Sequence, residues 1–123
     1  MANSVGLHEA EDRLDRATVD RHRALSSLQE ELEAIDWYDQ RIDAAEDVEL
    51  KQILAHNRDE EKEHAAMVLE WLRRRDPAFE SALRLYLFSE GSIIDREKEA
   101  EAGGAEASTG DGSLAIGSLR SDR

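Results

Sequence analysis

Apolar residues recur at helical spacing along two long stretches of the chain. In the first stretch they stand three, four or seven positions apart, which marks one face of a helix: Leu25, Leu28, Leu32, Ile35 and Ile42. In the second stretch they again gather on one side: Leu50, Ile53, Leu54, Ala65, Val68, Trp71 and Leu72. The pattern predicts two amphipathic helices, over residues 9–45 and 48–75, joined by a turn at 44–48 in which Asp47 caps the second helix.

A third, shorter helix is predicted after the second one. Asp76 and Pro77 stop the long helix and start a new one, because aspartate caps a helix and proline fits its first position. The short helix is expected over residues 78–88, with its end near Gly91. We therefore predict an all-α protein, an antiparallel two-helix hairpin followed by a short C-terminal helix.

The composition changes after this helix. The next residues are acidic, small and rich in glycine, which predicts a disordered linker, and a few apolar residues return at the end of the chain. The predicted parts are a flexible N-terminus at 1–8, a helical hairpin domain at 9–94, the disordered linker at 95–112 and a terminal peptide at 113–123.

Charge and composition argue against several classes of partner. The 123 residues carry a formal net charge of −13, and no basic stripe is present to neutralise phosphates, so we expect no nucleic-acid partner. No apolar run approaches the roughly 20 residues of a membrane span, and the N-terminus lacks the apolar core of a secretory signal, so we expect no membrane partner. The absence of cysteine removes disulfides and thiolate metal sites.

A polar island interrupts the apolar face of the second helix at residues 56–64, HNRDEEKEH. On a helical wheel, Glu61 lies within about 20° of Leu54 and Val68, and His64 lies about 60° away. A lone buried carboxylate costs several kcal/mol unless something pairs with it, and a metal ion reached by both side chains of this Glu-x-x-His motif would supply the pairing. The alternatives are a histidine bonded to a glutamate, or a wet groove.

The first helix offers a third ligand. Glu31 lies about 60° from the centre of its apolar face, and it stands as far before residue 46 as Glu61 stands after it. The hairpin should therefore bring Glu31 level with Glu61 and His64, which favours a metal site over a structural polar cluster. Four-helix di-iron proteins use two such sets. One chain is half a site, so we predict a two-fold dimer that forms a ferritin-like four-helix bundle.

A second acidic group lies on the opposite face of the first helix. It consists of Glu30 and Glu33 with Trp37 beside them. One interpretation is a solvated face with a tryptophan at an oligomer contact; the other is a surface beside a second subunit, where carboxylates collect hard divalent cations. Tyr38, at the edge of the apolar face, is either an interface tyrosine or a hydrogen-bond partner of a ligand at the metal site.

Several motifs in this order resemble the encapsulated ferritins of bacterial encapsulin systems. They are EELEAIDWYDQR, HNRDEEKEHAAM, LEWLRRR and LYLF, within about residues 20–90. The terminal peptide resembles the cargo-loading peptide that docks on the inner wall of an encapsulin shell, and a loose tether with a few apolar anchors suits that task. The residues concerned are Ser113, Leu114, Ile116, Gly117, Ser118, Leu119 and Arg120.

The resemblance implies a ferroxidase that binds two iron ions per subunit pair and oxidises Fe(II) to Fe(III). Glu31, Glu61 and His64 would be the iron ligands, with Tyr38 as a catalytic residue and Trp37 beside the site. Glu30 and Glu33 would form an outer acidic site where metal enters, with iron, calcium or another divalent cation bound there. The family forms decamers, as pentamers of dimers, inside an encapsulin nanocompartment in the bacterial cytoplasm, and the shell stores the mineral.

Two alternatives stay open on the sequence. In the first, the protein is a non-enzymatic helical cargo or scaffold protein whose polar island only fixes the register of the dimer. In the second, it is a di-metal protein that reduces peroxides, since such ligands also accept manganese or zinc.

Overall fold

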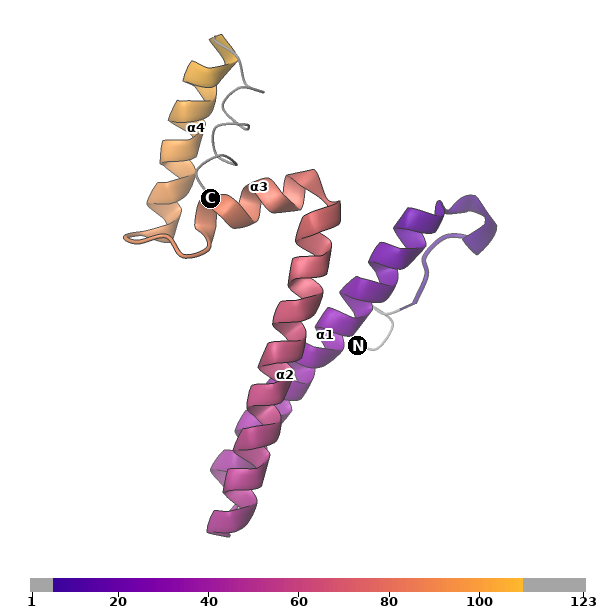
Figure 1. Ribbon diagram of the computed structural model, residues 1–123, viewed down its shortest axis with the longest axis vertical. Coiled ribbons are helices and arrows are strands. Elements are labelled where there is room, and N and C mark those ends of the chain that lie inside the picture. Colours follow the sequence, from indigo (N-terminus) through magenta and orange to yellow (C-terminus); the bar gives the residue numbers. More distant parts are fainter. Residues whose placement is uncertain (1–5, 110–123) are drawn as a thin grey trace. The chain divides into compact units, whose positions relative to one another are not determined.

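The computed structural model describes the backbone of residues 6–109 and the side chains of residues 6–103. The described part is helical and contains no strand, which confirms the predicted all-α class (Figure 1). Its elements are the 3₁₀ turn η2 (Glu11–Arg13), α1 (Arg16–Ala44), α2 (Val48–Arg75), α3 (Pro77–Tyr86) and α4 (Ile93–Thr109). The chain divides into two compact units, one ending at Pro77 and one beginning at Ala78, and each is described by itself.

The first unit is the predicted hairpin of α1 and α2. Figure 1 shows the two helices side by side as they run to the turn between them. The backbone N–H of Ala45 closes α1 on the carbonyl of Arg41 at 2.9 Å. Asp47 Oδ2 accepts a hydrogen bond from Leu50 N at 2.8 Å, so the predicted capping role of Asp47 is confirmed.

The start of α1 differs from the prediction. The helix begins at Arg16 rather than at residue 9, and the separate 3₁₀ turn η2 precedes it. Residues 9–15 contain one large apolar residue, Leu14. They offer no apolar face to pack, and a helix of this length gains most of its stability from such packing.

The two long helices leave part of their apolar faces uncovered within one chain. Among the described residues only Ala65 and Leu72 are fully buried apolar side chains. Four side chains of the predicted stripes stay 45% to 54% exposed: Leu25, Leu32, Leu50 and Ile53. We call this set the open stripe. Its exposure indicates a surface that one hairpin cannot bury alone.

Helix α3 begins at Pro77, the last residue of the first unit, which occupies the first helical position as predicted, and the rest of α3 belongs to the second unit. The helix ends at Tyr86, a little before the expected end at residue 88. Ser89 N and Ser89 Oγ both donate to the carbonyl of Tyr86, at 3.3 and 2.7 Å. Phe88 and Gly91 adopt left-handed φ values of 60° and 81°, which turns the chain out of the helix.

The predicted disordered linker at 95–112 is wrong over residues 95–109, which form most of α4. Ser92 Oγ accepts from Asp95 N at 3.3 Å near the start of the helix. Arg96 pairs with Glu99 and Lys98 pairs with Asp95, three positions apart. The prediction of disorder relied on the lack of apolar residues in this segment. Alanine, glutamate and lysine nevertheless have high intrinsic helix propensity, which does not require packing against a core.

Three predicted segments fall partly or wholly outside the described residues, among them the linker at its residues 110–112. The terminal peptide at 113–123 lies outside them entirely, and so does the first part of the N-terminus. None of the helices in residues 6–109 combines the length and the apolar character that a bilayer crossing requires.

Candidate metal centre

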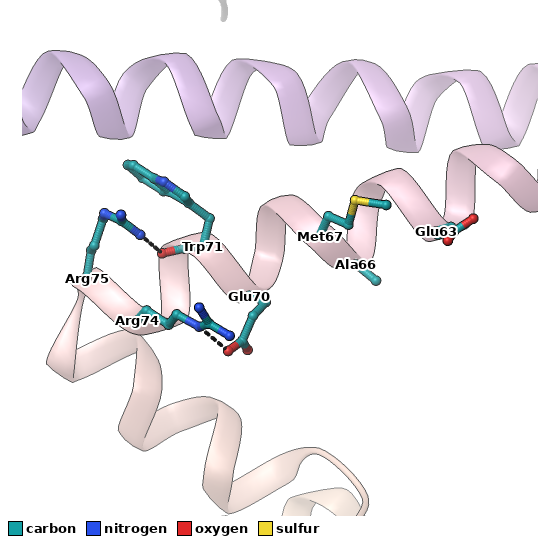
Figure 2. Close-up of a pocket in the computed structure, with 7 residues that line it drawn as sticks. All are labelled: Glu63, Ala66, Met67, Glu70, Trp71, Arg74 and Arg75. Carbon is teal, nitrogen blue, oxygen red and sulfur yellow. Dashed lines mark hydrogen bonds and ion pairs between the residues drawn. The ribbon is translucent and has the colours of Figure 1, made fainter.

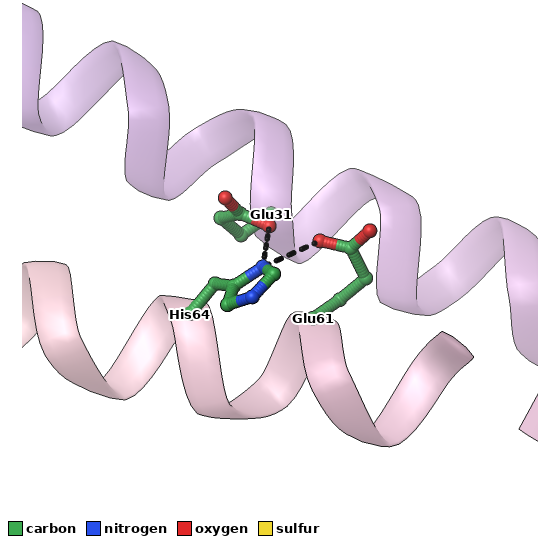
Figure 3. A group of neighbouring side chains, drawn as sticks. All are labelled: Glu31, Glu61 and His64. Atoms are coloured by element: carbon green, nitrogen blue, oxygen red, sulfur yellow. Dashed lines mark ion pairs between the residues drawn. The ribbon is translucent and has the colours of Figure 1, made fainter. Parts of the chain in front are cut away.

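Three ligand-type side chains meet between α1 and α2 (Figure 3). Glu31 comes from α1, whereas Glu61 and His64 come from α2. His64 Nδ1 lies 3.5 Å from Glu61 Oε1 and 3.7 Å from Glu31 Oε1. One ligand atom from each of the three residues lies within 4.8 Å of the others. The structure thus brings together the side chains that the helical wheel and the hairpin register predict.

The local fold explains this meeting. Glu61 and His64 are three positions apart on α2, so both project from the same side of that helix. Because α1 and α2 run antiparallel from the turn between them, Glu31 on α1 lies level with Glu61 on α2. Both carboxylates keep only about a quarter of their side-chain surface exposed, at 24% and 25%, while the imidazole is about half exposed. The set is therefore open to solvent on one side.

The surroundings of Glu31 disfavour the charged form of its carboxylate. A hydrogen bond between Glu31 and Glu61 is the largest cause that raises the pKa of Glu31 above its ordinary value of 4.5. Partial burial and the negative charge of Glu61 raise this pKa further, and the attraction of His64 opposes them. The surroundings of Glu31 thus disfavour its charged form, and a bound cation would offset this effect.

The sequence model of the EncFtn-like family matches residues 6–90 of the chain. The chain belongs to this family. It is 56% identical to the encapsulated ferritin-like protein of Rhodospirillum rubrum, over 98% of this chain and 91% of that protein. It is 35% identical to the encapsulin nanocompartment cargo protein EncC of Myxococcus xanthus, over 76% of this chain and 79% of that protein.

The EncFtn-like fold also has a counterpart among solved structures. The crystal structure of a protein from Nitrosomonas europaea matches the chain with a TM-score of 0.70 at 60% identity. The match covers 72% of this chain and 97% of that one. The helical arrangement described above is therefore shared with a relative whose structure was determined by crystallography.

The other predicted site residues of this EncFtn-like chain lie outside the central set. Glu30 and Glu33 are exposed on α1 and join no group of three ligand-type side chains within the described residues. Trp37 is about half exposed. Tyr38 is half-buried, and the guanidinium of Arg41 stands 5.2 Å from the centre of its ring. Their roles at an outer acidic site or beside the metal stay predictions.

Sequence reasoning missed one polar link between the helices. Arg58 Nη1 on α2 donates to Asp39 Oδ1 on α1 at 3.0 Å, and Arg58 Nε donates to Asp59 at 3.2 Å. A signal for this pair was present, because Asp39 lies about 20° from Leu28 on the wheel, in the middle of the apolar face of α1. A carboxylate at such a position needs a partner on the facing helix.

A shallow groove on α2 is separate from the metal-type set (Figure 2). Its volume is about 530 Å³, and the guanidinium of Arg75 stacks 4.1 Å from the ring centre of Trp71 at one end. The lining residues are Glu63, Ala66, Met67, Glu70, Trp71, Arg74 and Arg75. Arg73 and Arg74 donate hydrogen bonds to Glu70, which lowers the pKa of Glu70 to about 2 and keeps its carboxylate ionised. The groove lacks the convergent ligand atoms that the centre provides.

Proposed function

We propose that the protein is a ferroxidase that oxidises Fe(II) to Fe(III) at a di-iron centre shared by two chains. The observation that carries the proposal is the convergence of Glu31, Glu61 and His64, with ligand atoms within 4.8 Å of one another. Two carboxylates and one imidazole per chain are the donor set from which four-helix di-iron sites are built. In a ferroxidase, iron is the substrate that these side chains bind.

The proposed centre requires a second chain, because one chain supplies only part of the ligands of a di-iron site. A di-iron site of this class takes four carboxylates and two histidines from four helices, and one hairpin supplies half of these ligands. The open stripe of Leu25, Leu32, Leu50 and Ile53 gives the apolar surface on which a second hairpin could pack. A two-fold axis beside Glu61 would duplicate the ligands and close the four-helix bundle.

The chemistry uses the charge of the site. Carboxylate oxygens are hard ligands that suit iron, and they favour the higher charge of Fe(III) over Fe(II). The pKa of Glu31 is raised chiefly by its hydrogen bond with Glu61, and binding of an iron cation would favour the ionised carboxylate of Glu31. With dioxygen as oxidant, two Fe(II) ions lose one electron each, and dioxygen takes up the two electrons and two protons to leave as hydrogen peroxide. The protein residues hold the two ions close enough to deliver both electrons together.

The proposal extends to the partner and to the compartment. The relatives from Rhodospirillum rubrum and Myxococcus xanthus bear names that speak of encapsulation and of encapsulin cargo. We extend these roles to this chain: its terminal peptide at 113–120 binds an encapsulin shell protein, and Fe(III) is stored as mineral inside that shell in the bacterial cytoplasm. Deletion of residues 113–123 should then abolish co-purification with the shell while leaving Fe(II) oxidation intact.

The finer assembly belongs to the same proposal. The dimers assemble further into a decamer, and Glu30 and Glu33 at the outer acidic site attract iron, calcium or another divalent cation toward the centre. Tyr38 and Trp37 act beside the bound metal. Support for the outer site is physical: exposed carboxylates on a chain of net charge −13 attract cations.

The test is the rate of Fe(II) oxidation under dioxygen, followed by the absorbance of Fe(III). Glu61→Ala and His64→Ala should lose at least about tenfold in rate, because removal of a ligand leaves no bound di-iron pair. Glu63→Ala is the matched control, because Glu63 is an exposed carboxylate on the same helix between the two ligands. Oxidation by Glu61→Ala at the wild-type rate would contradict the proposal.

The same experiment separates the alternatives. If the centre only fixes the register of a cargo protein, Glu61→Ala should lose assembly, measured by sedimentation, while the wild-type protein never exceeds the background rate of oxidation. If the protein reduces peroxides, anaerobic oxidation of Fe(II) by hydrogen peroxide should be fast and the reaction with dioxygen should stay at background.

A further inference from the structure

Arg58 links the two helices next to the metal centre by an ion pair that is separate from the contacts among the three ligand-type side chains. Its guanidinium donates to Asp39 across the hairpin at 3.0 Å, which is a well-formed charge-assisted hydrogen bond. By contrast, His64 Nδ1 and Glu31 Oε1 lie 3.7 Å apart, too far for a hydrogen bond. The side chain of Arg58 is only 25% exposed, so the pair is partly screened from water.

The ion pair between Arg58 and Asp39 runs obliquely between the two helices, an orientation that resists sliding of one helix along the other. Arg58 stands three positions before Glu61, which places it about 4.5 Å away along α2. If residues 31 and 61 are level, residue 34 is level with Arg58, and Asp39 lies about 7.5 Å nearer the turn than residue 34. The arginine stem therefore runs diagonally between the helices. When one helix slides along the other, the distance between the partners of an oblique ion pair changes at once. Such an ion pair therefore resists sliding better than one at right angles to the helix axes.

Packing within one hairpin offers weak resistance to such sliding. The open stripe is exposed, and Ala65 and Leu72 are the fully buried apolar side chains among the described residues. A coordinated metal tolerates little error, because atoms about 2.0–2.2 Å from one ion lie at most about 4.4 Å apart. The present ligand atoms lie within 4.8 Å of one another. A slip of one residue would move Glu31 by about 1.5 Å along the axis and take it out of reach.

We propose that Arg58, through its ion pair with Asp39, is a positioning residue that fixes the register of α1 against α2 and holds Glu31 within reach of the ion bound by Glu61 and His64. The inference rests on the proposed function, because it assigns a role at the same centre. The charge of Arg58 does not switch with pH, because the hydrogen bonds that Arg58 donates to Asp39 and Asp59 raise its pKa above an already high value.

The test is the affinity of the full-length protein for Co(II), a probe that oxygen does not oxidise readily and whose visible spectrum reports its ligands. Arg58→Met keeps the apolar stem and removes the charge, and Asp39→Asn keeps the shape of its partner. Each should weaken Co(II) binding about three- to fivefold, the range expected for loss of a partly exposed ion pair. The double variant should bind no more weakly than either single variant, since both remove one link.

Asp59→Asn is the matched control. Asp59 also accepts from Arg58, at 3.2 Å, but it lies on the same helix and cannot tie α2 to α1. This variant should keep wild-type affinity, and Arg58→Lys, which retains a charge able to reach Asp39, should recover at least half of the loss in binding free energy. The Co(II) absorption band should shift in Arg58→Met and Asp39→Asn and stay unchanged in Asp59→Asn, a response that general destabilisation would not give.

Two outcomes separate this inference from the proposed function. Wild-type affinity and an unchanged Co(II) spectrum in Asp39→Asn, with the helical circular dichroism intact, would overturn the positioning role and leave the ferroxidase proposal standing. A wild-type protein that binds no Co(II) would overturn both. Asp39 is about half exposed, so Asp39→Asn should fold even if Arg58→Met does not.

Discussion

The open stripe leads to a quantitative prediction for Leu25→Asp. Leu25 is 51% exposed in the single chain. Full burial of a leucine side chain is worth about 1.5–3 kcal/mol, so covering its exposed half in an interface supplies about 0.75–1.5 kcal/mol per chain and about 1.5–3 kcal/mol for the two copies in a dimer. Aspartate removes this gain and adds the cost of desolvating a carboxylate.

The dimer of Leu25→Asp should therefore dissociate at least about 10- to 150-fold more readily than the wild-type dimer. The assay is sedimentation velocity over a range of protein concentrations, with a chelator present so that metal ions do not hold the chains together. Leu25 lies almost two turns from Glu31, so the substitution leaves the ligands of each chain in place.

Gln52→Asp is the control for the added charge. Gln52 is exposed on α2, about 180° from Glu61 on the wheel, so its substitution adds the same charge on the opposite face. It should leave assembly unchanged. If Leu25→Asp assembled with wild-type affinity, the open stripe would not be the dimer interface, and the argument that a second hairpin completes the centre would fail.

Three further predictions concern stability. Because its hydrogen bond with Glu61 raises the pKa of Glu31, the metal-free protein should lose stability as the pH rises from 4.5 through the raised value. Glu31→Gln should flatten this pH dependence and raise the unfolding temperature at pH 7 in the presence of a chelator. A lower unfolding temperature for Glu31→Gln would contradict this prediction. Asp47→Ala removes the cap on Leu50 N and should cost about 1 kcal/mol in chemical denaturation, whereas Asp47→Asn should cost much less. Leu72→Ala, at a side chain 1% exposed, should cost about 2–5 kcal/mol in the same assay, and a loss below 1 kcal/mol would show that the site collapses around the cavity.

The sequence predicted the hairpin well because its signals are local and strong. The second helix runs over Val48–Arg75, as the apolar period, the cap at Asp47 and the stop before Pro77 indicate. The polar island was recognisable because Glu61 interrupts an otherwise apolar face. The meeting of Glu31 with Glu61 needed one further assumption, a tight turn near residue 46, and the short connection between α1 and α2 satisfies it.

The failures have physical causes as well. Helix α4 was missed because its stability does not depend on an apolar face, so the period that identifies other helices is absent. The link between Arg58 and Asp39 was missed because the wheel places Asp39 on the apolar face but does not identify its partner, which depends on rotamers and on the register of the two helices. The start of α1 was predicted too early because acidic helix-forming residues precede it without anything to pack against.

The most direct test of the central claim is native mass spectrometry of the protein loaded with Fe(II) without oxygen, beside the metal-free protein. The account predicts an even-numbered assembly that carries about one iron per chain, and loss of that iron in Glu61→Ala but not in Glu63→Ala. An assembly that binds no iron would contradict a shared di-iron centre and would leave Glu31, Glu61 and His64 as a structural polar cluster.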